Sequence, residues 1–447
     1  MKRRKFIGRT LAGGAVAGAG LSSIEPGSAL AYSRRKEVVI REQGKYDILL
    51  KGGHVIDPGN NINSPMDVAI TEGKIAVVGK NLPANDAKRT IDVSGLYVSP
   101  GFIDIHIHAF YTFKFEYYNY RWIIPDDFSF PYGVTTNVDA GSSGVYNFDK
   151  FKEIIDSSVS RLLAFINISA PGMDANENEP ATFKIALIQQ KIRKYQDLIV
   201  GIKTAHYGPG IPYDDIHTPW ASVDAAVRAG ELAGLPVMFD YSARPAQGKW
   251  PERTYRELIL EHGRPGDIHT HFLSKTPYVE NGKPSEDLYK ARDRGFIFDL
   301  GHGGGSFRWE VAVPVVMEGK FYPDSISTDL HSHNTSNGKV LNMANVMSKC
   351  LALRMPLEEV IRCSTVNPAR EINRPELGSM KVGNTADIAV FEVLNKEIDY
   401  IDARGGKMSG DKEIHNIMTL FGGEVAFDPW GLNALFWQNM PVRRRRG

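Results

Sequence analysis

Side chains that can bind a metal ion or move a proton stand at the ends of several short apolar runs in this 447-residue chain. They are His106 and His108 on one run, and Lys203, His271 and Asp329 on three later runs. Residues i and i+2 of a strand face the same side, so both imidazoles of the first pair can reach one cation. Nitrogen and oxygen ligands without thiolates suit zinc or a similar divalent ion in an open, catalytic site.

Each of these residues also has an ordinary explanation when it is taken alone. A His-x-His pair is common, Lys203 could be a surface cation, and Asp329 could cap the helix that follows it. Their shared position favours a site instead, because independent accidents would not place such residues at the matching ends of separate runs.

The spacing of the apolar runs predicts the fold. The runs lie at 102–108, 134–139, 162–168, 199–203, 237–240, 268–271, 296–300 and 325–329. The intervals between them carry helical patterns. Strand–helix units repeated in this way indicate an α/β protein with a closed (β/α)8 barrel, whose active site lies at the carboxyl ends of the strands. An open doubly wound sheet is the alternative, but no G-x-G-x-x-G follows an early strand.

Both ends of the chain have a different texture, with short alternating strands and glycine-containing turns. This texture covers residues 46–99 and returns in residues 371–430. Each set is small for an independent core, so we predict that the two pack together as one small, β-sandwich-like domain beside a barrel at 100–370. Residues 431–447 end in a basic tail, which is typical of a solvated chain end.

Residues 1–31 have the features of a twin-arginine export signal. Arg3 and Arg4 precede a weakly apolar stretch rich in alanine and glycine, and Ala29–Ala31 supplies small residues at the spacing of a cleavage site. A basic, irregular N-terminus is the alternative. The signal predicts an exported, periplasmic protein.

The composition excludes several classes of protein. Hydrophobic residues make up 42% of the chain and charged residues 23%, as in ordinary globular proteins. Lys and Arg number 53 against 52 Asp and Glu, which gives no electrostatic case for nucleic acid. Two cysteines cannot build a disulfide framework, and the mean hydropathy of −0.26 excludes a multi-span membrane protein. A small-molecule substrate is expected, and the sequence leaves open whether the protein forms a homo-oligomer.

Several motifs together resemble the amidohydrolase superfamily. The stretch Pro100–His108 is similar to its strand-one signature, and Gly201–Lys203, Thr270–His271 and Ser327–His331 are similar to its fourth, sixth and eighth strand motifs. Asp299–Ser306 and Asn367–Ala369 further resemble a deacetylase-like branch related to dihydroorotases and D-aminoacylases. The resemblance covers about residues 46–430 and is much less specific to substrate than to superfamily.

This resemblance implies a centre with two divalent ions, for which zinc is the expected metal. His106, His108 and Asp329 would hold the more buried ion, and His271 would help to bind the second. Lys203 would be carboxylated by CO2 and bridge both ions, since a bare ammonium has no lone pair to offer.

Asp240 departs from the resemblance, because the family usually has a histidine at the end of strand five. We predict Asp240 as a ligand of the second ion, since a carboxylate can bind zinc. It could instead orient a neighbouring ligand, which would leave a single-metal enzyme open, with His206 or His269 as substitute ligands. His269 lies two residues before His271 and should therefore face the same side.

The expected reaction is hydrolysis of a non-peptide C–N bond, in an N-acyl amide of the deacetylase type, by a metal-activated hydroxide. Asp329 would act as general base and then as general acid. His302 and His206 are candidates for substrate binding, and a structural role for His302 stays open. The aromatic segment 110–122 could wall the pocket or pack as a helix on the barrel.

Other functions remain in competition. A cyclic amide, an ester or a lactone could be hydrolysed by the same chemistry. A metal-free oligomeric scaffold or a carbohydrate-binding protein belongs to another class, and neither would depend on a metal.

Overall fold

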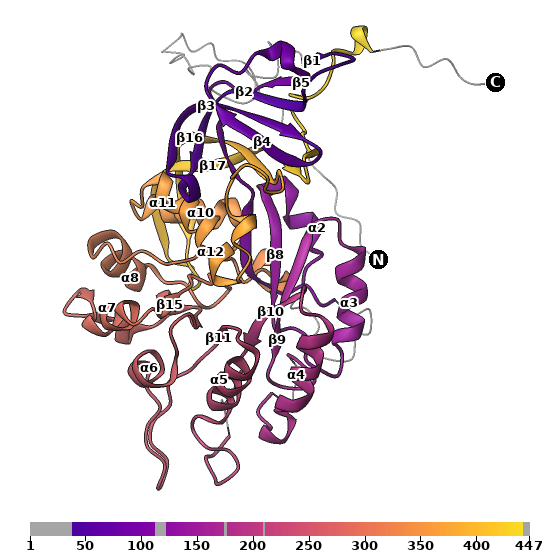
Figure 1. The fold of residues 1–447 in the computed structure, drawn as a ribbon. Coiled ribbons are helices and arrows are strands. Elements are labelled where there is room, and N and C mark those ends of the chain that lie inside the picture. The colour runs from indigo at the N-terminus through magenta and orange to yellow at the C-terminus, as the bar shows by residue number, and fades with distance from the viewer. Residues whose placement is uncertain (1–37, 112–121, 174–176, 209–210, 441–447) are drawn as a thin grey trace, which may run out of the picture.

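The computed structural model describes residues 38–111, 122–173, 177–208 and 211–440 (Figure 1). The predicted export signal, most of the aromatic segment and the arginines of the basic tail lie outside the described residues. Among the described residues, no helix combines the length and the apolar character needed to cross a membrane.

The central element is a parallel sheet whose strands follow the predicted apolar runs. They are β7 (Phe102–Ile107), β8 (Val134–Ala140), β9 (Arg161–Asn167), β10 (Ile199–Lys203), β11 (Val237–Phe239), β12 (Ile268–His269) and β15 (Ile297–Phe298). Each strand pairs with the next in the chain. β7 and β8 are buried along their whole length, as strands covered on both faces must be.

The eighth run joins the two edges of this sheet. Ser325 bridges to Asp299 just after β15, and Leu330 bridges to Ile107 at the end of β7. The parallel strands therefore curve into a barrel, as the spacing predicts, although the last run is held by single bridges.

Helices cover the outside of the barrel. They are α2 (Pro125–Phe128), α3 (Phe148–Ser157), α4 (Ile185–Lys194), α5 (Ala221–Ala233), α6 (Tyr255–Glu257), α7 (Glu286–Asp293), α8 (Trp309–Ala312), α9 (Ser332–Ser336), α10 (Met343–Ala352), α11 (Leu357–Arg362) and α12 (Val366–Glu371). Phe148 of α3, Ile188 of α4 and Val223 of α5 are buried in the core shared with the strands. Apolar positions at helical spacing create these packing faces.

Both ends of the chain build one β domain, shown at the top of Figure 1. Its sheet contains β1 (Val39–Ile40), β2 (Tyr46–Asp57), β3 (Ile62–Thr71), β4 (Lys74–Gly79), β5 (Ala87–Asp92), β6 (Tyr97–Pro100), β16 (Ile388–Ile401), β17 (Lys407–Phe421) and β18 (Glu424–Phe427). The N-terminal β6 pairs with the C-terminal β16, for example Val98 with Val390. Strands from both ends, with Ile48 and Ile417 among them, share one apolar core.

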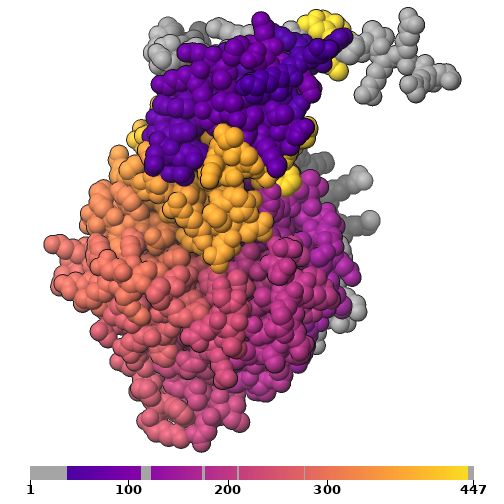
Figure 2. All heavy atoms as spheres, viewed as in Figure 1, coloured from indigo at the N-terminus to yellow at the C-terminus, as the bar shows by residue number. Residues whose placement is uncertain are grey.

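The hairpin of β16 and β17 also reaches the barrel. The backbone N–H of Ala403 donates to the carbonyl of Phe307 (2.9 Å), and Asp402 accepts from the N–H of Trp309 (3.2 Å). Ser348 of α10 accepts from the N–H of Ile414 on β17 (2.9 Å). On the face shown in Figure 2, orange C-terminal residues lie between the indigo strands and the magenta barrel, so the β domain and the barrel are packed together.

Candidate metal centre

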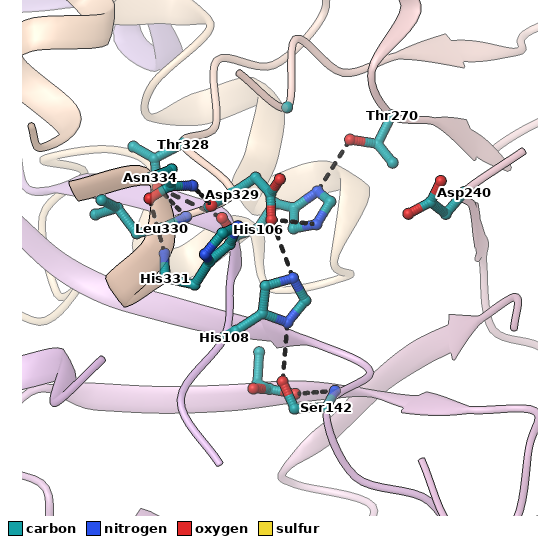
Figure 3. A network of polar contacts seen from close by, with 12 residues as sticks. His106, His108, Ser142, Asp240, Thr270, Thr328, Asp329, Leu330, His331 and Asn334 are labelled. Atoms are coloured by element: carbon teal, nitrogen blue, oxygen red, sulfur yellow. Dashed lines mark hydrogen bonds and ion pairs between the residues drawn. The ribbon is translucent and has the colours of Figure 1, made fainter. Parts of the chain in front are cut away.

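Ligand atoms from separate strands converge where the barrel strands end (Figure 3). One ligand atom each of His106, His271 and Asp329 lies within 4.8 Å of the others. The Oδ1 atom of Asp329 lies 3.0 Å from Nε2 of His108 and 3.5 Å from Nε2 of His106. All four side chains are buried. The structure thus brings together four of the residues predicted to bind metal.

The imidazoles of His106, His108 and His271 share one arrangement. In each ring, Nδ1 contacts a protein oxygen and Nε2 faces a carboxylate. The Nδ1 partners are Thr270 Oγ1 for His106 (2.9 Å), Ser142 Oγ for His108 (2.9 Å) and the Gly301 carbonyl for His271 (2.5 Å). Histidines that bind metals are commonly oriented by a hydrogen bond at the other ring nitrogen.

The orientation of His106 follows from a chain of hydrogen bonds. Thr270 Oγ1 donates to Oδ2 of Asp299 (2.7 Å), so it accepts the proton on Nδ1 of His106. Nε2 of His106 then carries a lone pair and has no hydrogen-bond partner. Burial lowers the pKa of His106 to about 4, and the carboxylate of Asp329 opposes this shift. His106 is therefore neutral and ready to donate to a cation.

Left-handed backbone places two of the ligands. His271 has φ 66° and Asp329 has φ 53°, a conformation that is uncommon outside glycine. The N–H of Asp329 donates to the carbonyl of His106 (2.6 Å), which ties the end of the eighth run to β7. This turn of the chain brings the carboxylate over the imidazoles.

The same backbone overturns the prediction for His269. β12 ends at His269 and His271 is left-handed, so the alternation of a strand does not continue between them. The ring of His269 lies between Tyr255, Tyr278 and Phe298, and neither of its nitrogens has a hydrogen-bond partner. The ring of His269 is therefore enclosed by aromatic side chains, outside the group formed by His106, His271 and Asp329, and the expectation that it faces the same side as His271 was wrong.

A second group of charged residues adjoins the first. Oδ2 of Asp240 lies 3.6 Å from Nζ of Lys203, 3.6 Å from Nε2 of His271 and 2.8 Å from Nε2 of His206. Nδ1 of His206 lies 2.8 Å from Oε2 of Glu177. Glu177 raises the pKa of His206 to about 10, with a further contribution from Asp240 and against burial. Asp240 therefore lies inside the site, and His206 lies between two carboxylates.

The amine of Lys203 is the least satisfied group in this cluster. Lys203 is 1% exposed, and its Nζ has no hydrogen-bond partner. Gly141 makes room for it, since a Cβ there would lie 2.6 Å from Cβ of Lys203. A buried ammonium with one carboxylate at 3.6 Å and no hydrogen bond is costly, so the position suits a lysine whose charge is changed or bridged.

His302 has surroundings different from those of a substrate-binding residue. Its Nδ1 lies 2.9 Å from the Gly303 carbonyl, its Nε2 lies 2.9 Å from Nζ of Lys349, and its ring stacks on Phe307. Both ring nitrogens thus have protein partners. The structural role left open by the sequence describes His302 better than substrate binding through its nitrogens.

Some residues of the site were missed by the sequence analysis. Ser142 and Glu177 follow the second and third barrel strands, so their position after a strand was the one available signal. Thr270 stands directly before a predicted ligand, yet nothing in its neighbourhood indicates a hydrogen bond to His106. Lys349 lies within a helix whose other residues are mostly apolar and buried, and the sequence offers no sign of its contact with His302.

Comparisons with known proteins decide the family. The model of the Amidohydrolase family matches residues 309–425. A deacetylase of Enterococcus faecalis is 30% identical over 390 residues, which cover 85% of this chain and 99% of the relative. The chain belongs to the amidohydrolase family. A deacetylase of Agrobacterium fabrum is 33% identical to this amidohydrolase over 354 residues, 75% of this chain and 80% of the relative.

Solved structures support the same assignment. The crystal structure of an adenine deaminase superposes with a TM-score of 0.74 at 27% identity, and covers 86% of this chain and 100% of its own. The crystal structure of a dihydroorotase gives a TM-score of 0.69 at 29% identity, with 85% and 99% covered. This amidohydrolase is therefore an enzyme that hydrolyses C–N bonds, as the motifs predicted, and its clustered ligands can bind metal.

Proposed function

We propose that this amidohydrolase removes the acyl group from an N-acyl amide, using two divalent cations held in the cluster described above. The observation that carries the proposal is the set of three imidazoles whose Nε2 atoms face Asp329 and Asp240, beside a buried lysine whose amine has no hydrogen-bond partner among the described residues. Nitrogen and oxygen donors in this number fit a binuclear zinc centre.

The residues divide between two ions. His106, His108 and Asp329 would hold one cation, and His271 and Asp240 would hold the other. Lys203, carboxylated by CO2, would bridge them, which also removes the cost of its buried ammonium. The 2.8 Å contact between His206 and Asp240 supports the role of His206 as a residue that orients Asp240.

The protein's own groups account for proton transfer. Bound cations would supply Lewis-acid activation of water and of the amide carbonyl. Burial opposes ionisation of Asp329, but the imidazoles packed against it, with Nε2 of His108 3.0 Å from Oδ1, hold the pKa of its carboxyl well below the usual range. Asp329 is therefore an ionised acceptor that can take a proton from the attacking water and deliver it to the leaving nitrogen.

The acyl amide is favoured over a cyclic amide by the names of two relatives that are 30% and 33% identical to this chain, both deacetylases. We expect release of acetate from some members of a panel of N-acetylated amino acids, and loss of that activity after treatment with a chelator. A parallel panel of dihydropyrimidines, hydantoins, esters and lactones tests the alternatives. Ring opening without any acetate release would replace the acyl amide with a cyclic substrate.

We also propose that the protein is exported through its twin-arginine segment. A reporter enzyme without its own signal should reach the periplasm when fused to residues 1–31, and should stay behind when Arg3 and Arg4 are both replaced by lysine. Equal export of both fusions would exclude this route.

A further inference from the structure

Lys349 is a buried lysine whose hydrogen-bond partners are all uncharged. It lies on α10, is 2% exposed, and its Nζ contacts Nε2 of His302 (2.9 Å) and the carbonyls of Lys339 (2.6 Å) and Ile401 (2.8 Å). These three acceptors match the three N–H groups of an ammonium. Burial lowers the pKa of Lys349 to about 7, and Asp402 opposes this shift. Because a buried amine is costly to charge, a lysine at this position calls for a specific role.

The contacts of its two nitrogens determine the proton on His302. Since the Gly303 carbonyl can only accept, Nδ1 carries the ring proton and donates it (2.9 Å), which leaves Nε2 to accept from Lys349. The ring also stacks on Phe307. His302 is therefore fixed in one orientation, at the centre of a turn in which Gly301 and Gly303 both have left-handed backbone.

This turn, residues 301–303, forms the wall behind two proposed ligands. The Gly301 carbonyl accepts from Nδ1 of His271 (2.5 Å). On the other side, a Cβ on Gly303 would lie 2.3 Å from Oδ2 of Asp329, so the backbone touches that carboxylate. Any movement of the turn would move His271 and Asp329 with it.

We propose that Lys349 is a positioning residue of the hydrolytic reaction, which acts through His302 to hold residues 301–303 against His271 and Asp329. Its contact with the Ile401 carbonyl, at the end of β16, makes the hairpin of the β domain part of the same support. The β domain thereby contributes to the precision of the centre, although it supplies none of the proposed ligands. This inference rests on the metal centre of the proposed function.

The chain offers a matched control in Lys339. Its Nζ contacts the carbonyls of Ala403 (2.5 Å) and Gly304 (3.3 Å), so it links the same hairpin to the same loop. None of its hydrogen bonds goes to His302 or to a proposed ligand. Replacing either lysine by methionine removes a link between the domains, but only Lys349→Met releases His302.

The test compares Lys349→Met with Lys339→Met in protein loaded with Co2+, whose visible absorption reports ligand geometry. We expect Lys349→Met to change the cobalt spectrum and to lower kcat on a hydrolysed N-acetyl amino acid by about 10- to 100-fold, as for other residues that orient metal ligands. Lys339→Met should lower the thermal midpoint while its spectrum and kcat stay close to those of the wild type. Equal spectra and equal kcat for the two variants would overturn the inference.

A further variant covers the case in which Lys349→Met does not fold. His302→Phe breaks the same support from the other side, and it should reproduce the altered spectrum and the lower kcat. A normal cobalt spectrum in His302→Phe would overturn the role of this pair. Wild-type protein that binds no Co2+ would refute the metal centre itself, and a centre that binds Co2+ without N-acyl hydrolysis would refute only the substrate class.

Discussion

The Asp329→Asn variant is expected to fold, to retain most of its metal and to lose about 10³-fold or more in kcat. Removing a general acid–base group has effects of about 10²- to 10⁴-fold, and Asp329 is also in contact with two proposed ligands. Its Oδ1 lies 3.0 Å from Nε2 of His108, so an amide of the same shape keeps an oxygen there but cannot take a proton. Steady-state kinetics and elemental analysis of the purified variant check both parts.

Asp324→Asn is the matched control, because Asp324 directly precedes the same run and its carboxylate contacts residues outside the proposed ligand set. Its carboxylate accepts from Nη2 of Arg292 (3.2 Å) and from the N–H of Phe298 (2.9 Å). This variant should lower the thermal midpoint and leave kcat nearly unchanged. If Asp329→Asn kept wild-type activity while binding metal, the proposed proton transfer would be wrong.

The Lys203→Ala variant is expected to lose about 10³-fold or more in kcat/KM and to bind fewer metal ions, because the bridge between the two cations is removed. Lys203 lies beside Asp240, and its buried amine has no hydrogen-bond partner, so little else in the fold depends on its head group. The truncated side chain leaves space in which a small carboxylic acid could stand in for the carbamate.

Rescue distinguishes a bridging role from a structural one. Added formate, acetate or propionate should restore part of the activity of Lys203→Ala, whereas chloride at the same ionic strength should not. Mass spectrometry under mild conditions should also find the mass of CO2 on the wild type and not on the variant. A variant that recovers nothing with any acid, together with a wild type that carries no added mass, would remove the carbamate from the account.

The barrel could be predicted from sequence because its evidence is local. A buried strand such as β9 is a continuous apolar run from Leu162 to Ile166, and the intervals between runs are long enough for the crossovers that parallel strands need. The β domain was also predictable, since neither end of the chain has enough apolar residues for a core of its own. The pairing of Val98 with Val390 then joins segments that only the fold brings together.

The site was predictable only where the ligands follow the two-residue alternation of side chains along a strand. His106 and His108 are two residues apart at the end of one strand, so the spacing alone predicts that their side chains lie on the same face. His271 does not follow this rule, because its left-handed backbone turns it away from the side that His269 faces. A positive φ outside glycine leaves no mark in the sequence, so the error at His269 could not have been avoided by counting residues.

Contacts between distant segments set the remaining parts of the site. Glu177 meets His206 across a loop after β9, and Lys349 meets His302 from a helix that reads as apolar. Both depend on tertiary packing that spacing alone does not encode. Asp240, in contrast, could be singled out from the sequence because it departs from the family pattern. Its contacts with Lys203, His206 and His271 are seen only in the structure.

The central claim is that this amidohydrolase holds two divalent cations between His106, His108, Lys203, Asp240, His271 and Asp329. Elemental mass spectrometry of the purified protein, after growth with added zinc, tests it most directly. The account predicts two equivalents of metal per chain. One equivalent would contradict the bridged pair and return Asp240 to an orienting role, and none would contradict the metal centre altogether.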